Sequence, residues 1–241
     1  DAVPESVPAD VAAEAVPGAP ETSPACRDAL DVVAAPGATL TVVLTAACRA
    51  DERVVLRHAG LAVTLRTSDA GTLTASVPAF DPAGAVVAQF ADGTRVEAAA
   101  PVADLAGVAR FAVQWMAGDA FRLHAFAPGA EFGGPGHVHA GAPGSRGGAA
   151  GQVAALGDAS LDRALLAEVY TFPADRSAIT LEIEAPVEAG TCGRAMLGET
   201  LQWSDGTLTL RELTVDMPGC GDGDGFVLLQ NPMADLTLAA N

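Results

Sequence analysis

Apolar and polar residues alternate with a period of two along most of the chain after Cys26. In 73–77 the odd positions are apolar and the even positions are polar, as in a strand with one buried face. Asp-Gly pairs at 92–93 and 205–206 supply the positive φ that tight hairpins need. Such strands recur about every 8–12 residues. The sequence therefore predicts an all-β fold with two antiparallel β-sandwich domains, at 26–108 and 109–241.

Two segments of the second half depart from simple strand alternation. Ser160 is placed to cap a short helix over 161–169, but 166–172 fits a strand equally well. After Leu210 the apolar positions change phase, which predicts a β-bulge at 211–212 that returns the apolar side chains to the core.

The four cysteines form one close pair at each end of the β-patterned body. Cys26 and Cys48 lie 22 positions apart, and Cys192 and Cys220 lie 28 apart. Four cysteines allow three connectivities, of which two local disulfides are the simplest. The chain has neither a CxxC motif nor the Cys/His spacing of a zinc site. Disulfides form in oxidising compartments, so we expect an exported protein, periplasmic or on the extracellular surface.

Residues 1–25 differ from the rest of the chain in composition. They carry five prolines, five carboxylates and no basic side chain, with neither a helical nor a strand period. Such a segment buries too little apolar surface to offset its ordering entropy, so we expect a disordered acidic Pro/Ala-rich stalk. The chain begins at Asp1 without methionine, which fits a processed protein whose signal peptide or membrane anchor is missing.

The charge balance limits the partners. With 30 acidic and 13 basic residues the net charge is −17, which repels phosphate backbones and excludes nucleic acid. The longest apolar stretches, such as 40–48, fall far short of the roughly 18 residues that cross a bilayer. Contact with a membrane is therefore expected only through the missing N-terminal anchor, and other envelope proteins are the expected partners.

Two resemblances to known families add to this interpretation. The stretch 48–93, with a Thr-Ser-Asp-Ala-Gly turn at 67–71, resembles the transthyretin-like or carboxypeptidase-regulatory type of β-sandwich. Over 26–240 the chain is similar to an uncharacterised family of exported alphaproteobacterial proteins, some of them labelled translocases. The motifs that carry this similarity are Gly-His-Val at 136–138, Ala-Glu-Val-Tyr-Thr-Phe-Pro at 167–173, Cys-Gly-Arg at 192–194 and Met-Pro-Gly-Cys at 217–220. The second resemblance implies an envelope protein with an N-terminal membrane anchor.

The loop at 127–152 is rich in glycine and proline, and long loops of this kind are often functional. In a strand, His137 and His139 would point to the same face, a spacing that lets two imidazoles share a metal ion. His124 or Glu131 would supply a third ligand. The alternative is a polar strand face that faces solvent.

Other candidate ligand sites are weaker. Asp222 and Asp224 share a turn after Cys220 and resemble half of a calcium loop without its downstream acidic ligand. Trp115 and Tyr170 would stack on a sugar ring if they were exposed, although most aromatic residues of this chain are needed for the core.

Catalytic motifs are missing from the sequence. It contains no GxSxG, HExxH, P-loop or GxGxxG motif. Glu182 and Glu184 share one strand face, as solvent-facing glutamates do in any half-buried strand. We therefore expect a non-enzymatic cell-envelope module for interaction or structure, without a cofactor. The alternative is a domain that binds carbohydrate or a metal ion at the 127–152 loop.

Overall fold

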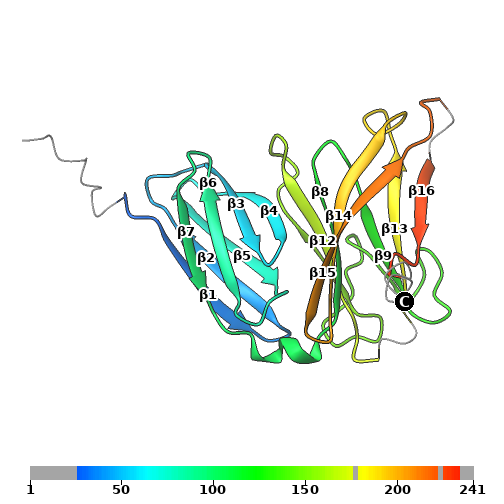
Figure 1. Cartoon of the computed structure of the whole chain (residues 1–241), viewed down its shortest axis with the longest axis horizontal. Helices are drawn as coiled ribbons and strands as arrows, with labels where there is room; N and C mark the ends of the chain where they lie inside the picture. The colour runs from blue at the N-terminus through cyan, green and yellow to red at the C-terminus, as the bar shows by residue number, and fades with distance from the viewer. Residues whose placement is uncertain (1–25, 176–178, 222–224, 234–241) are drawn as a thin grey trace, which may run out of the picture.

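The computed structural model describes residues 26–175, 179–221 and 225–233, and these form an all-β fold of two antiparallel sandwiches (Figure 1). Residues 1–25, predicted to form a stalk, lie outside the described part. The first sandwich packs a three-stranded sheet against a four-stranded one. In spatial order these are β1 (Ala29–Ala35), β2 (Thr39–Thr45) and β5 (Thr72–Pro78), then β4 (Leu61–Arg66), β3 (Arg53–His58), β6 (Ala85–Phe90) and β7 (Arg95–Ala99).

The second sandwich follows a short 3-10 turn, η2 (Ala103–Gly107). Its outer sheet is β10 (His137–Val138), β9 (Arg122–Phe126), β13 (Thr180–Val187) and β16 (Gly225–Gln230). Its inner sheet, called here the shared sheet, is β11 (Gln152–Leu156), β12 (Leu165–Thr171), β8 (Arg110–Met116), β14 (Ala195–Ser204) and β15 (Thr207–Asp216). The predicted fold class, two antiparallel β-sandwiches that each contain a local disulfide, is thus confirmed.

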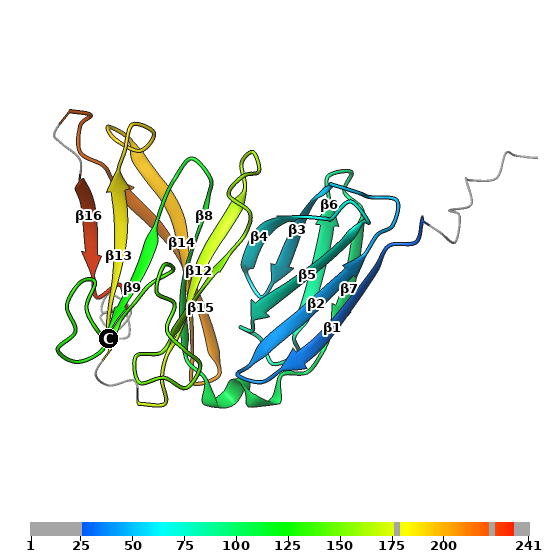
Figure 2. The same ribbon diagram turned by 180° about the vertical axis from the view of Figure 1, so that it is seen from behind.

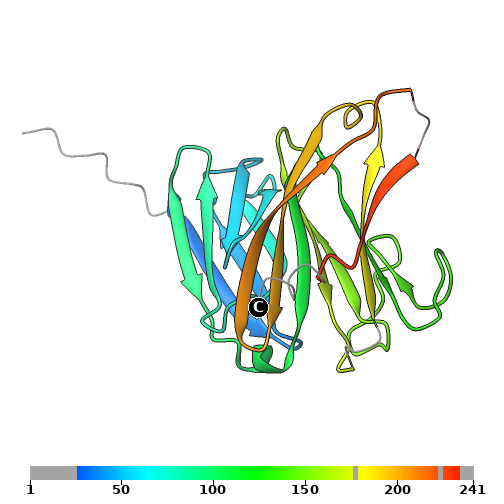
Figure 3. The same ribbon diagram turned by 45° about the vertical axis from the view of Figure 1, so that its right-hand side comes forward.

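The shared sheet closes the open side of the first sandwich. β4 and β5 are edge strands on the same side of the first sandwich, and that side faces the shared sheet (Figures 1 and 3). Val169, Leu201 and Trp203 project from the shared sheet into the hydrophobic core of the first sandwich. The opposite face of the same sheet packs in the second core. One core therefore continues from the first sandwich onto the shared sheet.

The outer edge of β4 is capped by polar groups of the second sandwich. Gln114 on β8 accepts from the amide of Ala62 at 3.0 Å and donates to the carbonyl of Gly60 at 3.0 Å. Thr64 accepts from the amide of Asp158 through its carbonyl at 2.8 Å, and from the amide of Leu165 through its hydroxyl at 2.9 Å. These bonds satisfy backbone groups that an exposed edge would offer to another strand.

Arg110 on β8 joins the two sandwiches at the bottom of the interface. Its guanidinium is 1% exposed and donates to the carbonyls of Gly37 and Ala38 at 2.7 and 2.8 Å, and also to that of Ala79. Its Nε donates to the hydroxyl of Thr171 at 3.1 Å. Burial lowers the pKa of Arg110 to about 10, so the side chain remains charged at neutral pH.

The structure decides one open alternative and corrects one local expectation. Of the two alternatives for the segment after Ser160, the structure shows the strand, β12. β8 is buried on both faces from Arg110 to Gln114 because a core lies on each side. The predicted bulge at 211–212 does not exist, since β14 and β15 pair in one register from Ser204↔Thr207 to Ala195↔Asp216. The phase change arises because Leu208 faces the first core and Leu213 the second.

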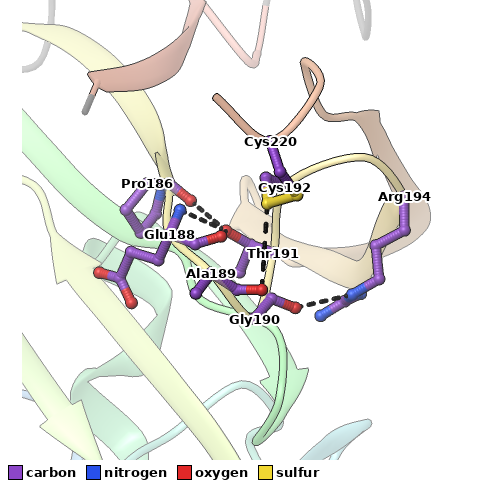
Figure 4. The surroundings of a disulfide bond; sticks show 8 residues. All are labelled: Pro186, Glu188, Ala189, Gly190, Thr191, Cys192, Arg194 and Cys220. Atoms are coloured by element: carbon purple, nitrogen blue, oxygen red, sulfur yellow. Dashed lines mark hydrogen bonds between the residues drawn. A yellow bond between two sulfur atoms is a disulfide. The ribbon is translucent and has the colours of Figure 1, made fainter. Parts of the chain in front are cut away.

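Both disulfides are local. Cys26–Cys48 ties the two ends of the β1–β2 hairpin together. Cys192–Cys220 links the turn after β13 to the segment that follows β15 (Figure 4). In the same turn the hydroxyl of Thr191 donates to the carbonyl of Pro186 at 2.7 Å and accepts from the amide of Glu188 at 2.9 Å. The two disulfides indicate an oxidising environment outside the cytoplasm. The described residues contain no helix that is long and apolar enough to cross a membrane.

Candidate functional site: an imidazole and carboxylate pocket

Strand register brings a set of polar side chains to the outer face of the outer sheet. His124 on β9 pairs with Glu182 on β13, and the next pair on the same face is Arg122 with Glu184. On the other side of β9, His137 pairs with Phe126. Side chains of alternate residues share a face, so His124, His137 and Glu184 lie together.

The loop between β9 and β10 folds back because glycines take up conformations that other residues rarely adopt. Gly133 and Gly136 have φ values of 72° and 86°. This loop follows β9 on the side of the molecule away from the first sandwich (Figure 2). Val138 is then 4% exposed in the second core, while His137 and His139 share the opposite face with ring centroids 4.6 Å apart, as the sequence predicted.

The hydrogen bonds assign the proton positions on the three imidazoles. The amide of Gly133 donates to Nδ1 of His137 at 2.9 Å, so a neutral His137 carries its proton on Nε2. That Nε2 lies 2.8 Å from Nδ1 of His124, to which it donates. The amide of Gly141 donates to Nδ1 of His139 at 3.2 Å. All three neutral imidazoles are therefore Nε2–H tautomers.

His124 has one polar atom that the fold leaves without a hydrogen bond. Its side chain is 6% exposed, and Nε2 lies 3.4 Å from Oε2 of Glu184 without hydrogen-bond geometry. Burial lowers the pKa of His124 from 6.5 to about 4, although Glu184 favours the charged form. Burial also lowers the pKa of His137. At neutral pH, His124 therefore presents a buried, uncharged N–H donor.

Two carboxylates and one guanidinium complete the polar set. Glu184 accepts from Nη1 of Arg122 at 2.7 Å. Glu168 extends from β12 to the amide of Leu123, which donates to its Oε2 at 2.6 Å. β10 pairs only with Ala125 and Phe126 on β9, so Glu168 takes the place of a strand partner for that amide. Burial raises the pKa of Glu168 from 4.5 to about 7.

These residues line a cavity of about 490 Å³ with an aromatic lip. Phe132 is 52% exposed, and its ring centroid lies 4.8 Å from that of His124 and 4.7 Å from that of His137. Phe226, 54% exposed, stacks on Phe132 at 6.5 Å. We call this cavity the imidazole pocket; its principal lining residues are Arg122, His124, Phe132, His137, His139, Glu168 and Glu184.

The structure brings together only part of the predicted ligand set. His124, His137 and His139 meet in the imidazole pocket, whereas Glu131 is exposed on the loop outside the pocket lining. Trp115 packs edge-on against Phe121 at 6.0 Å and lines a different cavity. Asp222 and Asp224 lie outside the described residues.

The expectation that Tyr170 stacks on a ligand is wrong. Tyr170 is fully buried, its hydroxyl donates to the carbonyl of Ala150 at 2.7 Å, and burial raises its pKa. Its role is to anchor the end of the glycine-rich loop. Gly151 fits there because it lacks a side chain, since a Cβ at that position would lie 2.4 Å from the tyrosine oxygen.

The tautomers argue against the predicted metal site. A metal ion binds the lone pair of an imidazole nitrogen, but the Nδ1 lone pairs of His124, His137 and His139 all accept hydrogen bonds. Their Nε2 atoms carry the protons. In the described part of the chain, no set of three or more His, Cys, Asp or Glu side chains is arranged to hold a metal ion.

The sequence did not identify Glu168, Glu184, Arg122 or Phe132 as pocket residues. Glu184 alternates with Leu181 and Ile183 like any solvent-facing glutamate, yet it is 6% exposed because the loop after β9 covers it. Glu168 was assigned to a segment that fitted a helix or a strand. The only available signal was its position within an otherwise apolar run, 164–170.

Fold and pocket together define a pair of β-sandwiches, each with its own disulfide, and a polar cavity on the outer sheet. No protein family matches the chain, and comparisons with curated proteins and with solved structures give no match. The functional argument therefore depends on the geometry of the imidazole pocket itself.

Proposed function

We propose that this chain is an exported, non-catalytic module of the cell envelope that binds a neutral polyhydroxylated ligand, a saccharide, in the imidazole pocket. The observation that carries the proposal is the buried Nε2–H of His124, which makes no hydrogen bond within the described residues and lies 3.4 Å from the nearest carboxylate oxygen, Oε2 of Glu184. A buried donor without a partner costs about 1–3 kcal/mol, and a ligand hydroxyl that accepts from it removes that cost.

The charge of the imidazole pocket favours a neutral ligand. The lowered pKa values keep His124 and His137 uncharged at neutral pH, and Arg122 offsets the charge of Glu184. An anion would meet the carboxylate of Glu184 and the partly ionised side chain of Glu168. A metal ion would have to displace protons from the imidazoles.

The arrangement of polar and aromatic groups supports a saccharide within the neutral class. Sugar hydroxyls donate and accept, which matches N–H donors on His124 and His139 beside carboxylate acceptors on Glu168 and Glu184. The exposed ring of Phe132 offers an apolar face at the entrance. A concave site with a few placed polar groups and aromatic walls is typical of small-molecule sites.

The first test is a titration of the folded chain with glucose, galactose, N-acetylglucosamine and chito-oligosaccharides, followed by NMR of the histidine ring protons. We expect saturable shifts at His124 and His139. His124→Phe keeps the aromatic stack but removes the donor, so it should weaken binding about tenfold. Phe132→Ala, at an exposed position that the fold tolerates, should also weaken it. Leu197→Ser, in a different cavity, is the matched control and should bind normally.

Three outcomes would overturn the proposal. One is the absence of any saturable shift. Another is a stoichiometric zinc, copper or nickel ion that survives desalting in native mass spectrometry and is lost in a His137→Ala, His139→Ala double variant. The third is turnover of the saccharide, which would replace a binding module by an enzyme.

The proposed location in the envelope has its own support and test. The two disulfides require an oxidising compartment, and the resemblance to exported anchored proteins suggests attachment through the N-terminus. Fractionation of the source cells should place the protein with periplasmic or surface markers. Recovery with reduced cysteines in the cytoplasm would contradict the proposal.

A further inference from the structure

The shared sheet extends beyond the area that the first sandwich covers. On one face of β14, Leu201 is fully buried and Trp203 is 5% exposed, whereas Leu197 on the same face is 59% exposed. On the corresponding face of β8, Ala112 is fully buried and Met116 is 42% exposed. The apolar surface that joins the two sandwiches thus continues beyond the interface, where it is exposed to solvent.

A groove of about 600 Å³ lies where this face emerges from the interface. We call it the interdomain groove; its lining includes Gly60 from the β3–β4 turn and Gln114, Met116, Leu197, Glu199 and Glu212 from the shared sheet. The lining residues come from both sandwiches, with Gly60 in the first and Met116 and Leu197 in the second. At the edge of the groove Leu210, 46% exposed, contacts the turn so closely that a Cβ on Gly60 would lie 2.7 Å from its Cδ2.

Two carboxylates lie side by side on neighbouring strands in the lining of the interdomain groove. Glu199 and Glu212 are directly opposite in the β14–β15 register, which is an unfavourable arrangement of like charges. Arg57 is the single basic side chain among the lining residues, so carboxylates outnumber cations in the groove. Glu199 is held in place because its Oε2 accepts from Nε2 of Gln114 at 2.6 Å. Gln114 is 7% exposed and is itself fixed by the edge of β4.

We propose that the interdomain groove docks a basic segment of a partner protein, in which one or two apolar side chains are flanked by arginine or lysine. The apolar side chains would continue the interface onto Met116 and Leu197, and the cations would neutralise Glu199 and Glu212. Electrostatic complementarity of this kind sets the choice of partner.

Charge disfavours two occupants that the chain itself could supply. Residues 1–25 carry five carboxylates and no basic side chain, so Glu199 and Glu212 repel them. A second copy also carries a net charge of −17 and is repelled as a whole.

The test is fluorescence anisotropy with a labelled peptide in which lysine alternates with leucine, against a peptide in which glutamate alternates with leucine. The lysine peptide should bind the full chain, and binding should weaken as salt is added. The double variant Glu199→Gln, Glu212→Gln should weaken binding about tenfold, equal to about 1.4 kcal/mol. Leu197→Ser, which removes an exposed apolar contact, should weaken it to a similar extent.

A matched control separates this site from general attraction to an acidic protein. The double variant Asp69→Asn, Glu97→Gln removes two exposed charges from the first sandwich and should bind as the unmodified chain does. Equal weakening by the two double variants, equal binding of the glutamate peptide, or no effect of Leu197→Ser would overturn the proposal. Near-UV circular dichroism verifies that each variant is folded.

Discussion

At the scale of single residues, His124 and Glu168 respond to pH in opposite directions. Burial raises the pKa of Glu168 from 4.5 to about 7, so its contribution to stability is complete below pH 4.5 and is lost as pH rises through 7. Burial lowers the pKa of His124 from 6.5 to about 4, so its contribution is present above pH 6.5 and is lost as pH falls through 4. Between pH 4.5 and 6.5 the two slopes oppose each other.

Removing the ionisable group at Glu168 should make the contribution of His124 to the pH dependence of stability measurable. Glu168→Gln retains an acceptor for the amide of Leu123 but cannot ionise. We expect the free energy of unfolding of this variant to rise by on the order of 2 kcal/mol between pH 4 and 6.5, whereas that of the unmodified chain changes less. Urea unfolding at several pH values measures this difference. Parallel pH profiles for the two proteins would contradict it, and Glu97→Gln, at an exposed position, is the control.

Only part of the candidate site could be predicted from individual residues of the sequence. The spacing of His137 and His139 predicted one shared face because the period of a strand is two. The contribution of Glu168 could not be predicted, since it depends on where β10 ends and leaves the amide of Leu123 without a strand partner. The direction of the hydrogen bonds, which argues against a metal, depends on two glycine amides that only the folded loop brings into place.

At the scale of elements, β8 depends on Arg110. Replacing this side chain by methionine fills a similar volume but leaves the carbonyls of Gly37, Ala38 and Ala79 without their donor. We expect Arg110→Met to lower the free energy of unfolding by about 3 kcal/mol or more, as measured by urea denaturation. Arg95→Met, at an exposed position on β7, should change it by less than about 0.5 kcal/mol. Similar losses of unfolding free energy from both substitutions would show that Arg110 does not hold the two sandwiches together.

The β14–β15 hairpin illustrates what a sequence pattern can and cannot predict. The predicted turn is confirmed, since Asp205 and Gly206 both have positive φ, as the tight hairpin requires. The predicted bulge was wrong because the strand packs against two cores rather than one. Leu208 and Leu213 lie on opposite faces, and each face is buried against a different core at a different end of the strand. The sequence alone does not indicate that the hairpin packs against a second core.

At the scale of the whole molecule, the continuous core should make the two sandwiches unfold together. Trp203 on β14 lies in the core of the first sandwich and donates to the carbonyl of Leu105 at 3.4 Å. Trp203→Ala should therefore lower the stability of both sandwiches by about 3–5 kcal/mol while one transition is retained. Hydrogen exchange of amides in β3 and β13 measures the two halves separately. Loss of protection in only one half would contradict a single cooperative unit.

The same shared sheet imposes an order on folding during synthesis and export. Trp203 lies 98 residues after its acceptor Leu105, so the first sandwich emerges long before the strands that cover its open side. Until those strands arrive, the nascent chain presents an apolar opening and the uncapped edge of β4 to its surroundings. The first half of this protein can therefore reach its final state only after most of the chain has been delivered, which makes the time of synthesis and export, rather than the mature state, the period in which it most needs protection from aggregation.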